Sequence, residues 1–449
     1  MKKIKVLFIK PPIPYHLNPK EQQPLGVLYV ASYVRSMGYE INLIDLSDKK
    51  INEAINFISR ADVYAFTSSF LDLCTCHKLA KEIKIKFNNS KIIIGGNGPT
   101  SSPECINPKI FNSMIIGEGE KAMLTFLNDV YSNHKLKRRY SEPFLLENEL
   151  NKLPFPARDL LDCQGGKIFN FGDEYIEGQS TGIITSRGCP FNCSFCASES
   201  MWHRKVRFRS VNSVVAEIKE IINKFGIYKI KFQDDTFTLS EKRVIDICKE
   251  IENLNKQYNK KLVWRCYGGR VNLVTEKMLR AMKKAGCKEV DFGIESGDQN
   301  ILDLMRKNIT VKQSINTIKL ARKVGIDSRS FMMVGLPGTT EKTADRDIEF
   351  IKKAKPDAIN LAIYTPYPGS DIWKQPEKYN IKILNKPKDY TELEKFNKYN
   401  MHILSNDPNR TTKSIIKIKG LSAQKLEKIK QKIIDYVINH RLFHYVKSN

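Results

Sequence analysis

The feature that most constrains the fold is an alternation of short apolar runs with amphipathic stretches, which begins near the first residue. Residues 26–37, 72–87 and 120–131 carry apolar side chains at helical spacing. The apolar runs between them are bounded by Pro, Gly, Asn or Ser, which predicts buried strands at 5–9, 41–46, 63–67, 92–94 and 113–116. Strands that alternate with helices predict a parallel, doubly wound α/β domain of Rossmann type over residues 1–132.

The alternation restarts with longer periods over residues 181–373. Helical patterns such as 214–225 and 312–324 separate six expected strands, at 182–185, 229–233, 262–266, 289–294, 330–334 and 358–363. Six such units predict a partial (β/α)6 version of the TIM-like barrel.

Two further segments complete the expected organisation. Residues 133–180 are polar and basic and contain Leu153-Pro154-Phe155-Pro156, which predicts a linker or strap. Residues 374–449 are basic and expected to be mainly helical, with Leu426 and Ile429 among the apolar residues at helical intervals. We expect a helix docked on the core with a solvated basic face, and the alternative is a surface for an anionic substrate, nucleic acid or membrane interface.

Composition limits the class of protein. Hydrophobic residues make up 41% of 449 residues and charged residues 27%, which excludes a disordered, collagenous or coiled-coil chain. Ten cysteines in this length do not form the dense framework of a small secreted protein. The apolar run near the N-terminus is too short for a signal peptide, and no stretch is long enough for a membrane span. We therefore expect a cytoplasmic protein whose net charge of +25 favours anionic partners.

The most specific motif places Cys189, Cys193 and Cys196 in a loop just after an expected strand. The spacing CxxxCxxC allows a compact loop to wrap three thiolates around one iron–sulfur cluster, which leaves one iron without a protein ligand. A zinc site is the alternative, but zinc ligands usually come as two pairs, and His203 is the nearest further candidate. The sequence therefore predicts a catalytic [4Fe-4S] cluster.

Polar residues follow the other expected barrel strands. Asp234 and Asp235 end one strand, Arg270 lies beyond the next, and Glu295 ends the fourth. In a parallel βα architecture these positions share one rim with the cysteine loop. One acid alone could be a helix N-cap, but together these residues predict a site for a polar, zwitterionic cofactor.

These motifs resemble the radical S-adenosylmethionine (SAM) superfamily over residues 182–373. The resemblance implies that SAM chelates the open iron and yields a 5′-deoxyadenosyl radical, and that the protein supplies orientation and excludes water. It also implies that Phe195 lies beside the adenine, that Asp234 or Asp235 meets the amino group, and that Glu295 and Ser296 meet the ribose. The expected SAM-binding residues are Phe195, Asp234, Asp235, Arg270, Glu295, Ser296 and Gly335.

The first domain resembles the cobalamin-binding domain that a subgroup of this superfamily places before the barrel. One departure is that the DxHxxG motif, which supplies an axial histidine to cobalt, is absent, and His16 lacks its flanking Asp and Gly. Many members also lack this motif. The residues expected to bind cobalamin lie at strand ends: Pro11, Pro12, Leu25, Gly26, Ser69, Leu71, Gly95, Gly96, Gly117 and Glu118.

The resemblance implies cobalamin-dependent methylation of carbon, with a radical cyclase or other rearrangement as the alternative. It also implies an electron donor such as flavodoxin or ferredoxin, and a small-molecule, lipid or peptide substrate that the positive charge suggests is anionic. A basic nucleic-acid-binding protein with a structural metal is a less favoured alternative. Cys74 and Cys76 are expected to be incidental thiols, and the basic run 202–209 is either a substrate grip or a solvated helix entry.

Overall fold

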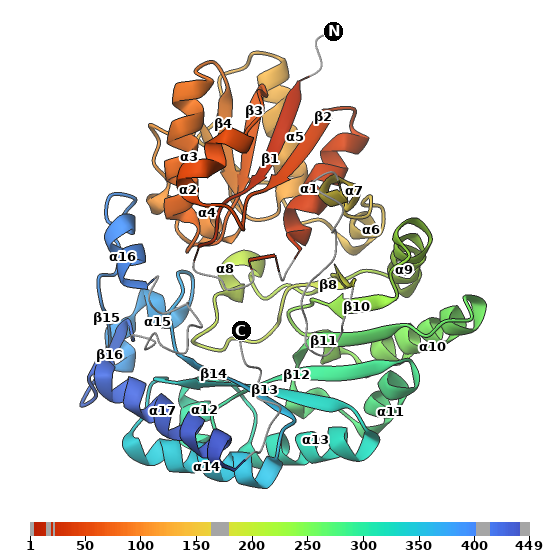
Figure 1. Cartoon of the computed structure of the whole chain (residues 1–449), viewed down its shortest axis with the longest axis vertical. Coiled ribbons are helices and arrows are strands. Elements are labelled where there is room, and N and C mark those ends of the chain that lie inside the picture. The colour runs from red at the N-terminus through yellow and green to blue at the C-terminus, as the bar shows by residue number, and fades with distance from the viewer. Residues whose placement is uncertain (1–3, 15–18, 21–22, 163–178, 401–413, 441–449) are drawn as a thin grey trace. The chain divides into compact units, whose positions relative to one another are not determined.

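The computed structural model describes residues 4–14, 19–20, 23–162, 179–400 and 414–440. They belong to two compact units (Figure 1). The first unit comprises Met1–Phe171 and Asn385–Ser405, and the second comprises Gly172–Leu384 and Asn406–Asn449. His16 and Cys163 lie outside the described residues.

The first unit is built on a sheet of six parallel strands in the order β2-β1-β3-β4-β5-β6. Ile9, Val63 and Ile94 on its central strands are fully buried, as expected for a parallel sheet covered on both faces. The strands are β1 (Lys5–Lys10), β2 (Glu40–Asp45), β3 (Val63–Thr67), β4 (Lys91–Gly95), β5 (Ser113–Ile115) and β6 (Arg139–Tyr140).

Helices cover this sheet, with α1 packed against α5 and α2 against α3 (Figure 1). The chain leaves β1 toward β2 on one side and resumes at β3 on the other, which makes a topological switch point where sheets of this kind bind ligands. The helices are α1 (Leu25–Ser36), α2 (Ile51–Ala54), α3 (Leu73–Lys86), α4 (Asn97–Ser101), α5 (Gly119–Tyr131), α6 (Glu147–Leu150), α7 (Asp159–Asp162) and α16 (Leu393–Asn400).

The second unit contains six parallel strands in the order β14-β13-β12-β11-β10-β7. Its two edges are β7 and β14, so the sheet is the open, partial barrel that the alternation predicts. The strands are β7 (Thr181–Ile183), β10 (Lys229–Phe232), β11 (Val263–Gly269), β12 (Cys287–Glu295), β13 (Asp327–Val334) and β14 (Ala358–Ile363).

Local signals define the barrel helices. In α9, for example, Ser210 caps the first turn through the N–H of Ser213, and Gly226 ends the helix in the left-handed region. The helices are α8 (Ser198–Trp202), α9 (Val211–Phe225), α10 (Glu241–Gln257), α11 (Glu276–Lys284), α12 (Gln299–Leu304), α13 (Val311–Val324), α14 (Glu341–Ala354), α15 (Asp371–Lys374) and α17 (Ala423–Asn439).

Two antiparallel pairs complete the second unit: β8 (Ser186–Arg187) with β9 (Arg207–Phe208), and β15 (Ile381–Ile383) with β16 (Ile416–Ile418). The expected C-terminal helix is α17, whose apolar face is buried and which packs on α14 and β14. Lys432 pairs with Asp345 of α14 at 2.6 Å, so α17 is docked on the core as expected, with part of its basic face paired.

The expected strands and helices are present in both units, and strands 63–67 and 358–363 have the expected bounds. The elements that the sequence did not indicate are short. They include β6, α6 and α7 in the expected linker, the β8–β9 pair, and the β15–β16 pair in the region expected to be mainly helical. Among the described residues, no helix is long and apolar enough to cross a membrane.

Candidate functional site

The three cysteines lie on the loop between β8 and α8, and this loop is anchored at Ser194. The N–H of fully buried Ser194 donates to the Met305 carbonyl at 3.0 Å, and its hydroxyl donates to Met305 Sδ at 3.4 Å. The Ser194 carbonyl accepts the N–H of Ile372 at 3.2 Å. The loop is therefore fixed between the end of α12 and the start of α15.

Each thiol has its own polar neighbour. Thr236 Oγ1 donates to Cys189 Sγ at 3.4 Å, and Arg270 Nη1 lies 4.0 Å from Cys193 Sγ. Cys196 is exposed at its surface, yet desolvation by the surrounding protein, followed by the Cys193 and Cys189 thiols, raises its pKa to about 11. The N–H of Ser198 donates to Cys196 Sγ at 3.4 Å.

This donor set fits an iron–sulfur cluster. All nine cysteines of the described chain are free thiols. Within the same residues, no group of three His, Cys, Asp or Glu side chains is arranged to hold one metal ion. Zinc ligands converge on a single ion, whereas the thiolates of a [4Fe-4S] cluster bind different iron atoms. The three cysteines of the loop supply the thiol ligands that such a cluster uses.

Gly188 and Asp235 shape the entry to the loop. Gly188 has a φ of 93°, and a Cβ at this position would lie 2.0 Å from the Lys205 carbonyl oxygen. Its N–H donates to Asp235 Oδ2 at 3.1 Å. Burial, together with the charge of Asp234, raises the pKa of Asp235, although the residue is exposed at the surface. No side chain larger than hydrogen fits at Gly188.

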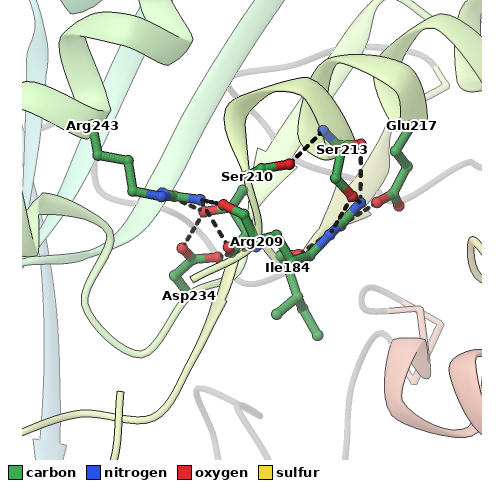
Figure 2. A network of polar contacts seen from close by, with 8 residues as sticks. Ile184, Arg209, Ser210, Ser213, Glu217, Asp234 and Arg243 are labelled. Atoms are coloured by element: carbon green, nitrogen blue, oxygen red, sulfur yellow. Dashed lines mark hydrogen bonds and ion pairs between the residues drawn. The ribbon is translucent and has the colours of Figure 1, made fainter. Parts of the chain in front are cut away.

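Asp234 is buried and supports the segment before the loop (Figure 2). It accepts hydrogen bonds from the Thr185 N–H at 2.6 Å, from the Thr185 hydroxyl, and from the Ser186 hydroxyl at 2.7 Å. Arg243 donates to the Thr185 carbonyl at 2.8 Å. Burial raises the pKa of Asp234, and the Thr185 bonds and Arg243 oppose that shift. Both oxygens of this carboxyl group are therefore occupied by the protein.

The same network contains a buried ion pair (Figure 2). Arg209 pairs with Glu217 of α9 and donates to the Ile184 carbonyl at 2.9 Å, and both side chains of the pair are buried. Arg243 also donates to the Arg209 carbonyl at 3.1 Å. Within the basic run 202–209, Arg209 therefore has a structural role. In the same run, Arg204 pairs with Glu199 at 2.8 Å on the surface.

Arg270 lies against the cysteine loop. Its guanidinium carbon is 3.5 Å from the centroid of the Phe191 ring, and it donates to the Lys307 carbonyl. The backbone N–H of Arg270 donates to Thr238 Oγ1 at 3.0 Å. A cation over an aromatic ring and close to a thiol provides positive charge where thiolates would carry negative charge.

Glu295 and Lys307 form a buried ion pair beside the aromatic residue of the motif. Lys307 Nζ lies 2.7 Å from Glu295 Oε1 and 5.7 Å from the centroid of the Phe195 ring. Glu295 has a φ of 68° and follows a register shift in β12. A Cβ at Gly293 would meet both charged groups at under 3 Å, so this glycine makes room for the pair.

The two remaining expected SAM-binding residues are engaged within the protein. Ser296 is buried, and its hydroxyl donates to Asp347 Oδ1 at 2.9 Å. A Cβ at Gly335 would lie 3.4 Å from Ile416 and 3.6 Å from Leu426. Ser296 therefore joins β12 to α14, and Gly335 packs against the C-terminal region.

In the first unit, close backbone packing occurs where β3 and β4 end. Gly96 has a φ of 98°, and a Cβ there would lie 2.5 Å from the Ser68 carbonyl oxygen. The Ser68 N–H donates to the Gly95 carbonyl at 2.9 Å, and the Ser69 N–H donates to Asp72 Oδ2 at 2.9 Å. Glycine is required for this approach, which brings the two strand-end loops together.

The other expected cobalamin-binding residues also lie at the carboxyl ends of strands or at the start of α1. A Cβ at Gly26 would meet nothing within 4 Å, and one at Gly117 would meet only a Phe144 ring atom at 4.0 Å. Glu118 is buried and accepts the Leu145 N–H at 2.7 Å. Four more of these residues are buried: Pro11, Pro12, Leu25 and Leu71.

Five cysteines outside the loop are fully or nearly fully buried. Burial raises the pKa of Cys105 and of Cys248 to about 12 in each case. Cys266 and Cys287 are buried on neighbouring strands β11 and β12. Cys76 is buried in α3 and Cys74 partly so. These thiols pack in the core, as expected.

Comparison with known proteins identifies the family. A model of the radical SAM superfamily matches residues 183–351, and a model of the B12-binding domain matches residues 19–127. An uncharacterised methyltransferase of Pyrococcus horikoshii is 32% identical over 420 residues, which cover 88% of each chain. This chain is a radical SAM protein with a B12-binding domain.

More distant proteins resemble this radical SAM protein along most of its length. Cytidylyl-2-hydroxyethylphosphonate methyltransferase of Streptomyces wedmorensis is 25% identical, over 83% of this chain and 81% of the relative. The solved structure of TsrM from Kitasatospora setae, a radical SAM methyltransferase with cobalamin and a [4Fe-4S] cluster bound, aligns with a TM-score of 0.69. It is 16% identical and covers 98% of this chain and 89% of that one. The two proteins share their fold.

Family membership assigns three cofactors: a [4Fe-4S] cluster and SAM to the barrel, and cobalamin to the first unit. The residues present fit these groups, because the barrel offers three free thiols on one anchored loop and the first unit offers open space at Gly26 and Gly117. Sequence reasoning missed Thr236, Arg243 and Lys307 as neighbours of the site. Thr236 directly follows the Asp-Asp motif, but no pattern signals that Lys307 pairs with Glu295.

Proposed function

We propose that this radical SAM protein is a cobalamin-dependent methyltransferase that methylates carbon in a small-molecule, lipid or peptide substrate with an anionic group. The observation that carries the proposal is the presence, in one chain, of the anchored loop with three free thiols and a doubly wound B12-binding unit. The relative from Pyrococcus horikoshii supports methyl transfer, because it bears that name and matches along most of both chains.

In this proposal Cys189, Cys193 and Cys196 hold the cluster and leave one iron for SAM. Exposed Asp235, not Asp234, meets the amino group of SAM, because the oxygens of Asp234 already accept bonds from Thr185 and Ser186. For the rest of SAM, Phe195 provides an aromatic face, and the ion pair of Glu295 and Lys307 beside it provides fixed charges.

When bound, these cofactors supply a 5′-deoxyadenosyl radical and a methyl carrier. The protein positions them and excludes water. We assign cobalamin to the strand-end loops of the first unit, where Gly96 permits close backbone packing and Gly26 and Gly117 leave open space. The residues flanking them are Pro11, Pro12, Leu25, Ser69, Leu71, Gly95 and Glu118.

The proposed reaction needs an electron for each radical, so it requires a reduced protein donor such as flavodoxin or ferredoxin. It also requires surroundings in which cysteines remain reduced. Nine free thiols in the described chain support a reducing compartment, and we place the protein in the cytoplasm.

The test does not need the substrate. The protein, reconstituted anaerobically with iron and sulfide, is incubated with SAM labelled in its methyl group, cobalamin and dithionite. We expect brown protein with about four irons per chain, 5′-deoxyadenosine, S-adenosylhomocysteine, and label on cobalamin. The variant C189A/C193A/C196A should lose the iron and 5′-deoxyadenosine, whereas the matched control C74A should retain both.

Other outcomes identify the alternatives. Deoxyadenosine without label on cobalamin would favour the radical cyclase or rearrangement over methyl transfer. Colourless protein that contains zinc would exclude the radical chemistry and favour a structural metal.

A further inference from the structure

The antiparallel pair β15–β16 carries an unusual pair of like charges. Lys382 lies directly opposite Lys417, and both side chains are exposed. Like charges directly opposite on neighbouring strands destabilise the pairing. The other face of the pair is apolar and buried, formed by Ile381, Ile383, Ile416 and Ile418. The buried isoleucines therefore stabilise the strand pair, and the two opposed lysines lower its stability.

Further lysines flank this pair. Lys419 follows β16, and Lys378 lies on η5, a 3-10 helix (Pro376–Tyr379) that contacts β15. Lys378 and Lys419 are both exposed. None of these four lysines makes an ion pair with another described residue. The one acidic side chain of η5 is Glu377. We call the four residues Lys378, Lys382, Lys417 and Lys419 the lysine ribbon.

Short structural links join the lysine ribbon to the cysteine loop within the second unit. The N–H of Ile372 on α15 donates to the carbonyl of Ser194, between Cys193 and Cys196. Helix α15 contacts η5, and η5 contacts β15. On the buried face, Ile416 of β16 packs beside Gly335, at the carboxyl end of β13. The lysine ribbon thus belongs to the same end of the barrel as the cysteines.

We propose that the lysine ribbon docks an acidic one-electron carrier protein that reduces the cluster. Radical SAM enzymes need a reductant, and complementary charge is the means by which brief redox encounters are guided across small interfaces. In the step, the carrier loses one electron and the oxidised cluster gains it, while no bond is made and no proton moves. The inference rests on the cluster assigned above, and it goes beyond methyl transfer because it concerns only delivery of the electron.

The test measures binding and reduction separately, on the full chain reconstituted with iron and sulfide. Reduced flavodoxin is the protein probe, and dithionite is the small reductant. We expect flavodoxin to bind with an affinity that falls as salt rises, and K382E/K417E to weaken this binding at low salt about tenfold or more. The variant should slow cluster reduction by flavodoxin and leave reduction by dithionite unchanged.

The matched control is K312E/K319E on α13, which changes the net charge equally at two exposed lysines. It should bind flavodoxin within about twofold of the original protein, since its charges lie outside the ribbon. Equal loss in both variants, no loss in K382E/K417E, or no flavodoxin binding at low salt would each overturn the proposal. The proposal would also be overturned if K382E/K417E lost binding of a single-stranded oligonucleotide but kept its binding of flavodoxin. Failed methyl transfer with intact flavodoxin binding would count against the proposed function alone.

Discussion

Asp234 and Asp235 are neighbours in sequence but have different surroundings in the fold. Asp234 accepts bonds from Thr185 and Ser186, whereas Asp235 is exposed beside Gly188. The sequence indicates a pair of acids at a strand end and does not distinguish their roles, because the roles depend on which carboxyl group faces the β7–β8 segment. The cysteines were predictable because their spacing is local. The pairing of Lys307 with Glu295 was not predictable, because it depends on the register shift in β12 beside Glu295.

The two aspartates can be separated by substitution. Asp234→Asn places an amide against hydroxyl donors and removes the negative charge that attracts Arg243, which should cost about 1–3 kcal/mol. The melting temperature should fall by about 2–10 °C, and the variant should incorporate less iron. Asp235→Asn should melt near the original temperature but bind SAM more weakly, as measured by equilibrium dialysis. A reversed pattern would show that Asp234 is the ligand-facing acid.

At the scale of elements, the alternation of apolar runs was enough to predict both sheets, because buried parallel strands and amphipathic helices leave different periodicities. Elements of two or three residues leave no periodicity, which is why β6, β15 and β16 were not expected. The segment boundaries near residues 132, 180 and 373 stay predictions. The apolar pattern also does not indicate contacts between elements. Asp347 of α14, for example, accepts hydrogen bonds from the Ser296 hydroxyl and the Gly297 N–H at the end of β12.

The link between α14 and β12 should make stability depend on pH. Burial, followed by the charge of Asp298, raises the pKa of Asp347 to about 7. An unfolded aspartate loses its proton near pH 4, so between about pH 4 and 7 the native state binds more protons than the unfolded state. Stability must then fall as pH rises through this interval.

Asp347→Asn keeps the acceptor oxygen and removes the titration. Between pH 5 and pH 8 the original protein should lose on the order of 2 kcal/mol more unfolding free energy than the variant. Urea denaturation at the two pH values measures this difference. The exposed control Asp303→Asn should behave like the original protein, and parallel pH profiles for the original and Asp347→Asn would disprove the assignment.

At the scale of the whole molecule, two sheets with different cofactors share one chain. Because each cofactor is assigned to residues within a single unit, damage to one site should leave the other loaded. Gly96→Ala would place a methyl group 2.5 Å from the Ser68 carbonyl oxygen and disturb the loops after β3 and β4.

We expect Gly96→Ala to retain its iron and to lose most cobalamin during gel filtration, as measured by absorption and iron analysis. Gly38→Ala is the control, since Gly38 also has a positive φ but a Cβ there would meet nothing within 4 Å. Loss of iron from Gly96→Ala would show that the two sites are coupled, and full retention of cobalamin would place that cofactor elsewhere.

The order in which the chain visits its two units limits how it can be shortened. Residues 385–405 return to the first unit before the chain ends in the second. There Phe396 meets the Phe70 ring and Glu394 pairs with Lys78 of α3 at 2.7 Å. A stop codon after residue 384 would remove these contacts and would also leave β15 without β16. A catalytic fragment that ends at residue 384 would therefore lose stabilising contacts in both units at once.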